Sequence, residues 1–563
     1  MAGNQFHTTL VNAAIFLLIL FTKTTAAEQP GQSEVGSRGL KSGSISQLSG
    51  YATTKGKLDS GQTQVYELNA AEGDYVQGQL AGPQLSLALL NRENQQVRML
   101  ARGEAMRQDF RFIVENKGPY KLEVSAAEPA SFSIQLKAFI PRNEQFPPPD
   151  VLQSPRLREL EETVSTSGST EQFWQEMQKQ GTPLIETANV IPPLSKGTAL
   201  VTFLWRGASR NVRLFGAPSG DHDELRRLKN SDVWFGSYRV PLSSRIGYKL
   251  APDVPEFKGT FWERRRAILA TAQHDPFNKK YFPEDAVDQY DGESFVELPG
   301  ASKQPWIIKN NDTPAGKVET HRFSSKIFGN IRDLFVYRPH DYQAASKQKC
   351  LLLVFDGEKY LNDIKLPVIL DNLIAMRMIP PTAVVFISNP SGESRSLELP
   401  CNPDLARFLA EELFPWIRQQ KLDTTREKTV IAGASYGGLA AAYAGLKHPE
   451  LFGNVYCQSG SFWWSPRSTP EMSEVEPEWL TRQFVTAPVE DVHFYLEAGQ
   501  FESNPRGGGS ILGTTRHLRD VLQAKGYLVQ LHEYASGHGY FYWRYNVPDA
   551  LIRLLGTQHT TTD

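Results

Sequence analysis

The chain has 563 residues, of which 40% are hydrophobic and 22% are charged, and its formal net charge is -2 at pH 7. This length corresponds to roughly three or four domains of an ordinary globular protein. The near-neutral charge and the lack of a basic run give no indication of nucleic-acid binding.

The N-terminus has the pattern of an export signal. Residues 10–21 (LVNAAIFLLILF) form an apolar run of signal-peptide length that is short for a membrane span. Small residues suited to cleavage follow, near Ala26 or Ala27. The positive n-region is poor, so an N-terminal membrane anchor is the alternative. We predict a signal peptide at residues 1–27, a flexible leader up to about residue 47, and no stable membrane span in the mature protein.

Three cysteines, Cys350, Cys401 and Cys457, lie in the C-terminal half. Their odd number leaves at least one thiol unpaired, and their spacing is not that of a zinc site. We expect core residues, and the sequence leaves open whether two of them form a disulfide.

Residues 44–141 are predicted to form a small β-sandwich. Six short runs have the alternation of β-strands, and turn residues separate them. The runs are Val65–Leu68, Tyr75–Leu80, Leu85–Leu90, Phe110–Val114, Tyr120–Val124 and Phe132–Leu136. The segment loosely resembles the pre-peptidase C-terminal type of module found on secreted bacterial enzymes. It holds no paired carboxylates or histidine cluster, so we expect a spacer or a binding accessory.

Residues 142–170 are predicted to be a linker, because they include the stiff run FPPPD at residues 146–150. Helices are expected over residues 156–164 and 171–180. Residues 171–300 are predicted to form an immunoglobulin-like domain, with Trp205 and Trp234 in its core. Its expected strands are Thr198–Trp205, Val212–Gly216, Val233–Val240 and Tyr248–Leu250.

Residues 317–558 alternate apolar strands with helical stretches, which predicts an α/β domain with a mainly parallel sheet. The near-continuous apolar strands are typical of a sheet that is buried on both faces. The expected strands are Asp333–Tyr337, Cys350–Phe355, Ala383–Ser388, Thr429–Ala432, Val455–Gln458, Val492–Glu497 and Leu528–Tyr534. The expected helices include Leu405–Arg418 and Leu439–Lys447.

Residues 433–437, Gly-Ala-Ser-Tyr-Gly, form a G-x-S-x-G motif between an apolar strand and an alanine-rich helix. This is the pattern of the nucleophile elbow of α/β-hydrolases, in which a tight turn exposes the serine hydroxyl at a helix N-terminus. Glycines flank the serine because a side chain there would collide with the neighbouring strand or helix. We therefore predict an α/β-hydrolase catalytic domain with Ser435 as nucleophile.

In this fold the acid and the base follow the nucleophile along the chain. His538 lies in a glycine-bounded loop after the last expected strand and is the best placed of the 11 histidines. Glu502 lies in the loop past the penultimate strand, where a carboxylate can accept the imidazole Nδ1–H. Glu497, inside that strand, and Asp491 are the lesser candidates for the acid.

An oxyanion pocket requires two N–H donors, one from the residue after the nucleophile and one from an earlier loop. The first is Tyr436. The second is expected from the loop after Cys350–Phe355, at Gly357 or Glu358, because glycine permits close backbone approach.

Several segments together carry a resemblance. They are residues 353–358, 398–402, 430–439 and 457–464, and the pair Gly537-His538 followed by Trp543-Arg544. They closely resemble the enterochelin (enterobactin) esterase family. The resemblance extends back through residues 203–206, 233–234 and 274–278, and so runs from about residue 170 to residue 557. It implies an α/β-hydrolase domain behind an immunoglobulin-like domain, and hydrolysis of the ester bonds of ferric catecholate siderophores to release iron.

The resemblance also implies the residues at the site. Ser435 is the implied nucleophile, His538 the implied base, and Arg395 an implied contact for the anionic iron–catecholate. Guanidinium and indole groups suit such a substrate, which is negatively charged and aromatic. Trp463, Trp464 and Arg544 are therefore added as substrate contacts. No metal cofactor is implied, since the iron belongs to the substrate.

Two departures from the family bear on this interpretation. Typical cytoplasmic members lack the leader and the first β module, which favours an exported, periplasmic protein here. Some members carry Asp where this chain has Gly539, and some relatives work with a Ser–His dyad, which would make Glu502 less important. The alternatives are a feruloyl or esterase D type carboxylesterase, and a secreted binding protein with a vestigial hydrolase domain.

Overall fold

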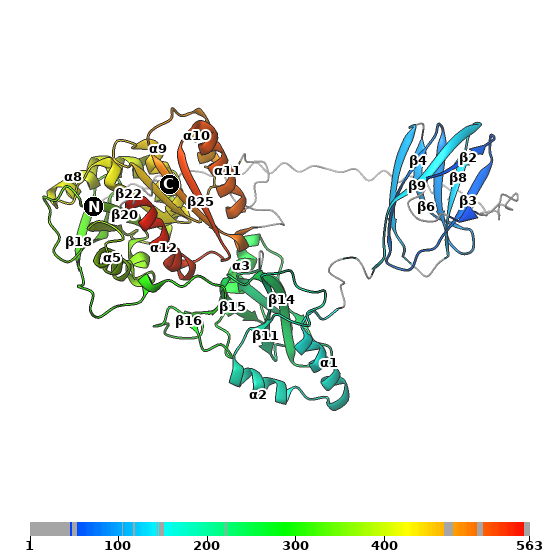
Figure 1. Ribbon diagram of the computed structural model, residues 1–563, viewed down its shortest axis with the longest axis horizontal. Helices are drawn as coiled ribbons and strands as arrows, with labels where there is room; N and C mark the ends of the chain where they lie inside the picture. The colour runs from blue at the N-terminus through cyan, green and yellow to red at the C-terminus, as the bar shows by residue number, and fades with distance from the viewer. Residues whose placement is uncertain are drawn as a thin grey trace, which may run out of the picture. The chain divides into compact units, whose positions relative to one another are not determined.

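The computed structural model describes residues 46–47, 53–103, 105–115, 119–142, 145, 151–219, 222–466, 477–503 and 510–556. The chain divides into two compact units, Met1–Asp150 and Val151–Asp563 (Figure 1). The predicted signal peptide at 1–27 and the proline run at 146–150 lie outside the described residues. Within the described ranges, none of the helices combines the length and the apolar character needed to cross a membrane. Cys350, Cys401 and Cys457 are buried and free, with no disulfide among them.

The first unit contains two antiparallel sheets around one core, drawn in blue in Figure 1. Apolar side chains alternate inward along the strands, as the period-two pattern predicts. One sheet has the order β1 (Ser46–Gln47), β3 (Thr63–Leu68), β8 (Tyr120–Ala126), β5 (Leu85–Leu90), β6 (Gln96–Gly103), in which β1 alone pairs parallel. The other has the order β2 (Thr53–Leu58), β9 (Ala130–Ile140), β4 (Tyr75–Ala81), β7 (Arg107–Ile113). Sequence reasoning missed β2 and β6, both edge strands with mostly exposed side chains.

The second unit begins at residue 151, so the predicted linker at 142–170 is too long. Helix α1 (Pro155–Ser167) lies within it, with Ser154 as its N-cap and Gly168 in the left-handed region (φ 69°) as its C-cap. Leu157, Leu160 and Val164 of α1 are buried against α2 (Glu171–Gln180) and the sheet that follows. The apolar stripe of α1 therefore makes this segment part of the folded unit.

Two four-stranded antiparallel sheets follow. Their inner faces share a core that includes Phe203, Ile246 and Tyr248. One sheet has the order β10 (Leu184–Glu186), β11 (Thr198–Arg206), β14 (Val233–Pro241), β13 (Arg226–Arg227); the other has the order β12 (Val212–Gly216), β15 (Arg245–Pro252), β17 (Glu293–Glu297), β16 (Tyr281–Phe282). Helix α3 (Phe261–Thr271) and the short turn η2 (Pro305–Ile307) complete this part, which we call the sandwich domain (residues 151–307).

The last part is built on an eight-stranded sheet. Its order is β18 (Lys317–Ser325), β19 (Asn330–Arg338), β21 (Thr382–Ile387), β20 (Cys350–Phe355), β22 (Thr429–Ala434), β23 (Asn454–Gln458), β24 (His493–Gly499), β25 (Leu528–Tyr534). The pairs from β21 to β25 are parallel, and the two pairs made by β19 are antiparallel. Central strands such as β20 and β22 are buried along their whole length, as their apolar runs predict.

Helices cover both faces of this sheet (Figure 1). Helices α5 (Leu366–Ala375) and α12 (Tyr540–Leu555) pack on one face; α7 (Pro403–Arg407), α8 (Phe414–Gln419), α9 (Tyr436–Lys447), α10 (Trp479–Thr486) and α11 (Ile511–Lys525) pack on the other. The short helices are α4 (Gly357–Asn362), α6 (Gly392–Glu398), η4 (Arg426–Lys428) and η5 (Gln500–Glu502). The helix expected over 405–418 is interrupted by a π-helical segment, η3 (Phe408–Leu413). Pro415 in the next turn has no N–H, which accounts for the wider turn before it.

Candidate active site

The G-x-S-x-G motif forms a sharp turn between β22 and α9. Ser435 has φ 57° and ψ -118°, a backbone conformation that a residue with a side chain rarely adopts. Its N–H donates to the carbonyl of Gln458 at 2.9 Å, which ties the turn to the end of β23. The strain is held in place by the strands and the helix packed around it. The turn leaves Ser435 only partly buried at the carboxyl edge of the sheet.

The two glycines of the motif are required by close packing. A Cβ atom on Gly433 would lie 2.5 Å from the backbone of Gly437, a distance that no side chain can adopt. A Cβ atom on Gly437 would lie 3.2 Å from Oδ2 of Asp356, at the end of the neighbouring strand β20. Glycine is therefore required at position 433 for the helix to start directly above the sheet, and at position 437 it avoids a tight contact with Asp356.

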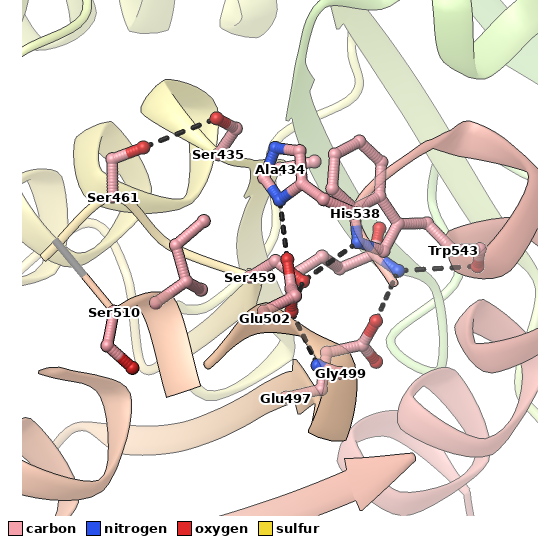
Figure 2. A network of polar contacts seen from close by, with 12 residues as sticks. Ala434, Ser435, Ser459, Ser461, Glu497, Gly499, Glu502, Ser510, His538 and Trp543 are labelled. Carbon is pink, nitrogen blue, oxygen red and sulfur yellow. Dashed lines mark hydrogen bonds and ion pairs between the residues drawn. The ribbon is translucent and has the colours of Figure 1, made fainter. Parts of the chain in front are cut away.

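His538 and Glu502 lie in contact, although they come from loops after different strands (Figure 2). The Nδ1 atom of His538 lies 2.5 Å from Oε1 of Glu502. The other carboxylate oxygen of Glu502 accepts hydrogen bonds from the N–H of Gly499 (2.5 Å) and the hydroxyl of Ser459 (2.8 Å). The Glu502 side chain is 3% exposed and that of His538 is 39% exposed. The Glu502 carboxylate is thus buried and fixed, while the imidazole faces outward.

The imidazole lies between Glu502 and Ser435 in Figure 2, with its second nitrogen on the Ser435 side. The Ser435 hydroxyl is hydrogen-bonded to the hydroxyl of Ser461 at 3.2 Å. Among the described residues no hydrogen bond joins Ser435 to His538. In ligand-free enzymes such contacts are often long and tighten when substrate binds.

The other two candidates for the acid lie elsewhere. Glu497 is buried inside β24, where it accepts hydrogen bonds from Tyr456 (2.9 Å), Gln458 (2.9 Å) and Asn546 (3.2 Å). Asp491 precedes β24, at the opposite end of the strand from Glu502, and pairs with Arg426. Of the three candidate carboxylates, Glu502 is the one that contacts His538.

Burial raises the pKa of Glu497 to about 8, and its hydrogen bonds from Gln458, Asn546 and Tyr456 act in the opposite direction. Since the unfolded value is 4.5, the folded protein retains a proton that the unfolded chain loses between about pH 5 and pH 8. The contribution of Glu497 to stability therefore decreases as pH rises through this window. Glutamine can replace the protonated acid, because its amide can donate to Tyr456 while its oxygen accepts the other two bonds.

We expect the Glu497→Gln variant to gain stability relative to wild type as pH rises from 5 to 8, by on the order of 4 kcal/mol. Urea unfolding of both proteins at several pH values measures this difference. Parallel pH dependence of the two proteins would mean that Glu497 is already ionised in the folded state.

Helix N-termini lie at the predicted oxyanion positions. Tyr436 is the first residue of α9 and Gly357 the first residue of α4, so their N–H groups have no acceptor within their own helices. Strands β20 and β22, which precede these helices, are parallel neighbours, so both helix starts lie at the same sheet edge. A Cβ atom on Gly357 would lie 2.8 Å from the backbone of Phe386, which explains the glycine. Glu358 follows in the first turn of α4.

Arg395 lies beside the turn but is already paired. Its guanidinium donates to both carboxylate oxygens of Asp356, at 2.6 and 2.8 Å, and lies 5.8 Å from the ring centroid of Tyr436. The Arg395 side chain remains 28% exposed, whereas that of Asp356 is 5% exposed. The arginine thus supports the loop that carries Gly357, and its charge is largely neutralised by Asp356.

The other three predicted substrate contacts lie in different parts of the structure. The indole of Trp463 lies 6.2 Å from the ring of Tyr436 and is near the turn. Trp464 packs against Trp479 and the core on the α9 face of the sheet. Arg544 donates to the carbonyl of Ile307 (3.3 Å), so its contact is with the segment that joins the two domains. Of these three residues, Trp463 alone is observed beside a residue of the serine turn.

Sequence reasoning missed the residues that contact Glu502 and Ser435. Ser459 bridges Glu502 to the indole N–H of Trp543 (3.1 Å), and the Trp543 ring lies 4.9 Å from the ring of His538. Ser461 holds the Ser435 hydroxyl. The signal was present in the run Gln458-Ser459-Gly460-Ser461, which follows a strand adjacent to the elbow. In the described part of the chain, no group of three or more His, Cys, Asp or Glu side chains is arranged to hold a metal ion.

Comparisons with known proteins find esterases. Residues 325–554 match a family described as putative esterase, and residues 200–307 match the N-terminal domain of enterochelin esterase. The iron(III) enterobactin esterase of Dickeya dadantii is 29% identical over 433 residues, which cover 69% of this chain and 94% of that protein. The iron(III) salmochelin esterase of Escherichia coli O6:H1 is 29% identical over 405 residues, covering 68% and 93%.

Solved structures show the same similarity. The enterobactin esterase of Shigella flexneri, crystallised in the presence of enterobactin, superposes with a TM-score of 0.53 at 26% identity, over 69% of this chain and 98% of that one. The ferric enterobactin esterase of Salmonella typhimurium has a TM-score of 0.55 at 25% identity, over 68% and 98%.

The fold and the family matches define a multidomain esterase. In its second unit, the sandwich domain matches the enterochelin esterase N-terminal domain, and the part built on the eight-stranded sheet matches the putative esterase family. The second unit of the chain is therefore similar to the enterochelin esterases over both of its parts.

Proposed function

We propose that this protein is a serine esterase of the α/β-hydrolase fold that hydrolyses the ester bonds of ferric catecholate trilactone siderophores such as enterobactin. The observation that carries the proposal is the 2.5 Å contact between His538 and Glu502 at the edge of the sheet where the Ser435 turn lies. The names of its relatives, iron(III) enterobactin and salmochelin esterases, support the choice of substrate.

The proposed reaction is acyl transfer through a serine ester. His538 takes the proton of Ser435, and the serine oxygen attacks the ester carbonyl. The N–H groups of Tyr436 and of Gly357 or Glu358 stabilise the oxyanion. His538 then protonates the leaving hydroxyl, and water releases the acid by the same sequence of steps. Glu502 keeps the imidazole in the tautomer that this exchange requires. No metal cofactor takes part in this scheme, and the iron belongs to the substrate.

For substrate binding we propose Trp463 as a stacking surface and the exposed part of the Arg395 guanidinium as a donor to the anionic head. Arg395 forms a bidentate pair with Asp356, which offsets its charge. We therefore propose that Arg395 orients the substrate by hydrogen bonding more than it attracts the substrate by net charge. Trp464 and Arg544 have less support, because their observed partners are Trp479 and Ile307.

We further propose that the protein is exported and acts in the periplasm, and that the first β-sandwich is an accessory to the esterase. The apolar run at residues 10–21 followed by small residues supports export.

The substrate assignment predicts that the purified protein cleaves a ferric tri-catecholate trilactone to linear products. Chromatography and mass spectrometry of the products, with the iron-free trilactone in parallel, measure this and show whether cleavage stops at trimer, dimer or monomer. A simple phenolic ester serves as the comparison substrate. Rapid cleavage of the phenolic ester with no cleavage of either trilactone would instead favour a carboxylesterase of the feruloyl or esterase D type.

A further inference from the structure

The residues after the proposed base lie in the core of the sandwich domain, and the residue before the proposed acid packs against that core. Phe541 and Tyr542, just after His538, belong to the cluster formed by Ala217, Ile246 and Tyr248, and Phe501, just before Glu502, packs against it. Phe541 and Tyr542 are each only 2% exposed. The start of α12 therefore belongs to the core of the sandwich domain, although the rest of this helix packs on the eight-stranded sheet.

Backbone contacts connect the loop of His538 to strand β15. The hydroxyl of Tyr542 accepts a hydrogen bond from the N–H of Gly247 (2.6 Å) and donates to the carbonyl of Gly247 (2.9 Å). The N–H of Arg245 donates to the carbonyl of Ala535 at 3.1 Å. Strand β15 thus binds the loop at Ala535, before His538, and at Tyr542, after it.

The same loop contacts the segment that carries the acid. The N–H of Phe501 donates to the carbonyl of Ser536 at 3.1 Å. On its other side, a Cβ atom on Gly537 would lie 2.8 Å from Cβ of Ala217 in the sandwich domain. The loop is therefore packed between η5 and the sandwich domain, and it has little room to move away from either.

From these contacts we infer that Tyr542 is a positioning residue through which the sandwich domain holds the His538 loop against Glu502. The inference rests on the proposed roles of Ser435, His538 and Glu502, but not on the identity of the natural substrate. Tyr542 itself touches none of the reacting atoms. Burial raises the pKa of Tyr542 well above its ordinary value, so its hydroxyl keeps the proton that it donates to Gly247.

The test uses a fluorophosphonate, which reacts with an activated serine whatever ester the enzyme prefers. The Ser435 oxygen bonds to phosphorus, fluoride leaves, and the serine proton passes to His538. In the full-length Tyr542→Phe protein, which loses only the hydroxyl, we expect the labelling rate to decrease by about 10- to 100-fold, since small displacements of catalytic groups have effects of this size. With a cleaved ester, kcat should decrease similarly while KM stays within about twofold.

Tyr545→Phe is the matched control. Tyr545 also lies on α12 at the sandwich domain, where its ring faces Arg245 at 4.0 Å and its hydroxyl faces Glu297, and it makes neither of the two Gly247 hydrogen bonds of Tyr542. We expect its labelling rate to stay within about twofold of wild type. Wild-type labelling by Tyr542→Phe, or an equal loss in Tyr545→Phe, would overturn the inference.

A second pair of variants changes the contact between the His538 loop and the sandwich domain at Gly537 and Ala217. This pair tests the inference if Tyr542→Phe does not fold. Gly537→Ala places a methyl group against Ala217, so it should also slow labelling, and adding Ala217→Gly should restore part of the rate. No restoration would contradict coupling between the sandwich domain and the loop. If the wild-type protein is labelled but leaves the trilactone intact, the substrate proposal fails and the positioning role is still measured.

Discussion

Replacing Ser435 by alanine is expected to lower the rate of ester hydrolysis by roughly 10⁴- to 10⁶-fold. The hydroxyl is the only group in the proposed mechanism that forms a bond to the substrate, so its loss removes the covalent route. The change should leave the fold intact, because the residue is only partly buried and, among the described residues, its hydroxyl bonds only to Ser461. Ester cleavage measured under single-turnover conditions, with circular dichroism as a check of folding, tests this.

Ser461→Ala is the control for that experiment. It removes a hydroxyl 3.2 Å from that of Ser435 without removing the proposed nucleophile. We expect Ser461→Ala to keep most of the activity. If Ser435→Ala also remained active, Ser435 would not be the nucleophile, and if its biological effect persisted without hydrolysis, the chain would act as a binding protein.

Replacing Glu502 by glutamine is expected to lower kcat by about 10³- to 10⁴-fold with little change in KM. The amide has the size of the acid, but it can donate to Nδ1 of His538 and so favours the wrong imidazole tautomer. The Glu502 side chain is almost fully buried and lies 2.5 Å from that nitrogen, so water cannot take over its role. Steady-state kinetics over a range of pH measure the loss.

Glu497→Gln provides a matched comparison, since it makes the same chemical change in the same strand–loop segment. Glu497 bonds to Tyr456, Gln458 and Asn546 and not to His538. We expect kcat of this variant to stay within about tenfold of wild type, and its stability to respond to pH as described above. A Glu502→Gln enzyme with nearly full activity would show that a Ser–His dyad suffices.

Much of the fold followed from local patterns. The apolar runs Leu351–Phe355 and Thr429–Ala432 predicted buried parallel strands because their period leaves no polar face. The ends of strands β20 and β25 were predicted to the residue, whereas several strands were missed, among them β2, β6 and β18. Those three strands lie at sheet edges, where exposed polar residues hide the alternation.

Positions in tertiary space were harder to predict. Arg395 is predicted to contact the substrate, but the sequence did not predict that its guanidinium also pairs with the carboxylate of Asp356, distant in sequence. Arg544 is also predicted at the site, and its observed contact with Ile307 was not predicted. Side chains this long reach partners that no local pattern specifies, so their roles depend on the packed structure.

The amino-acid sequence by itself determined the serine turn and the order of the candidate acid and base. The close contacts at Gly433 and Gly437 involve near neighbours in the chain or the end of the adjacent strand. A short sequence motif is therefore enough to predict the turn. Only the tertiary structure decided that Glu502 rather than Glu497 meets His538. It also decided that Tyr542 connects the base loop to the sandwich domain. Both contacts join segments far apart in sequence, and their geometry exists only after the sheet and the two domains have packed together.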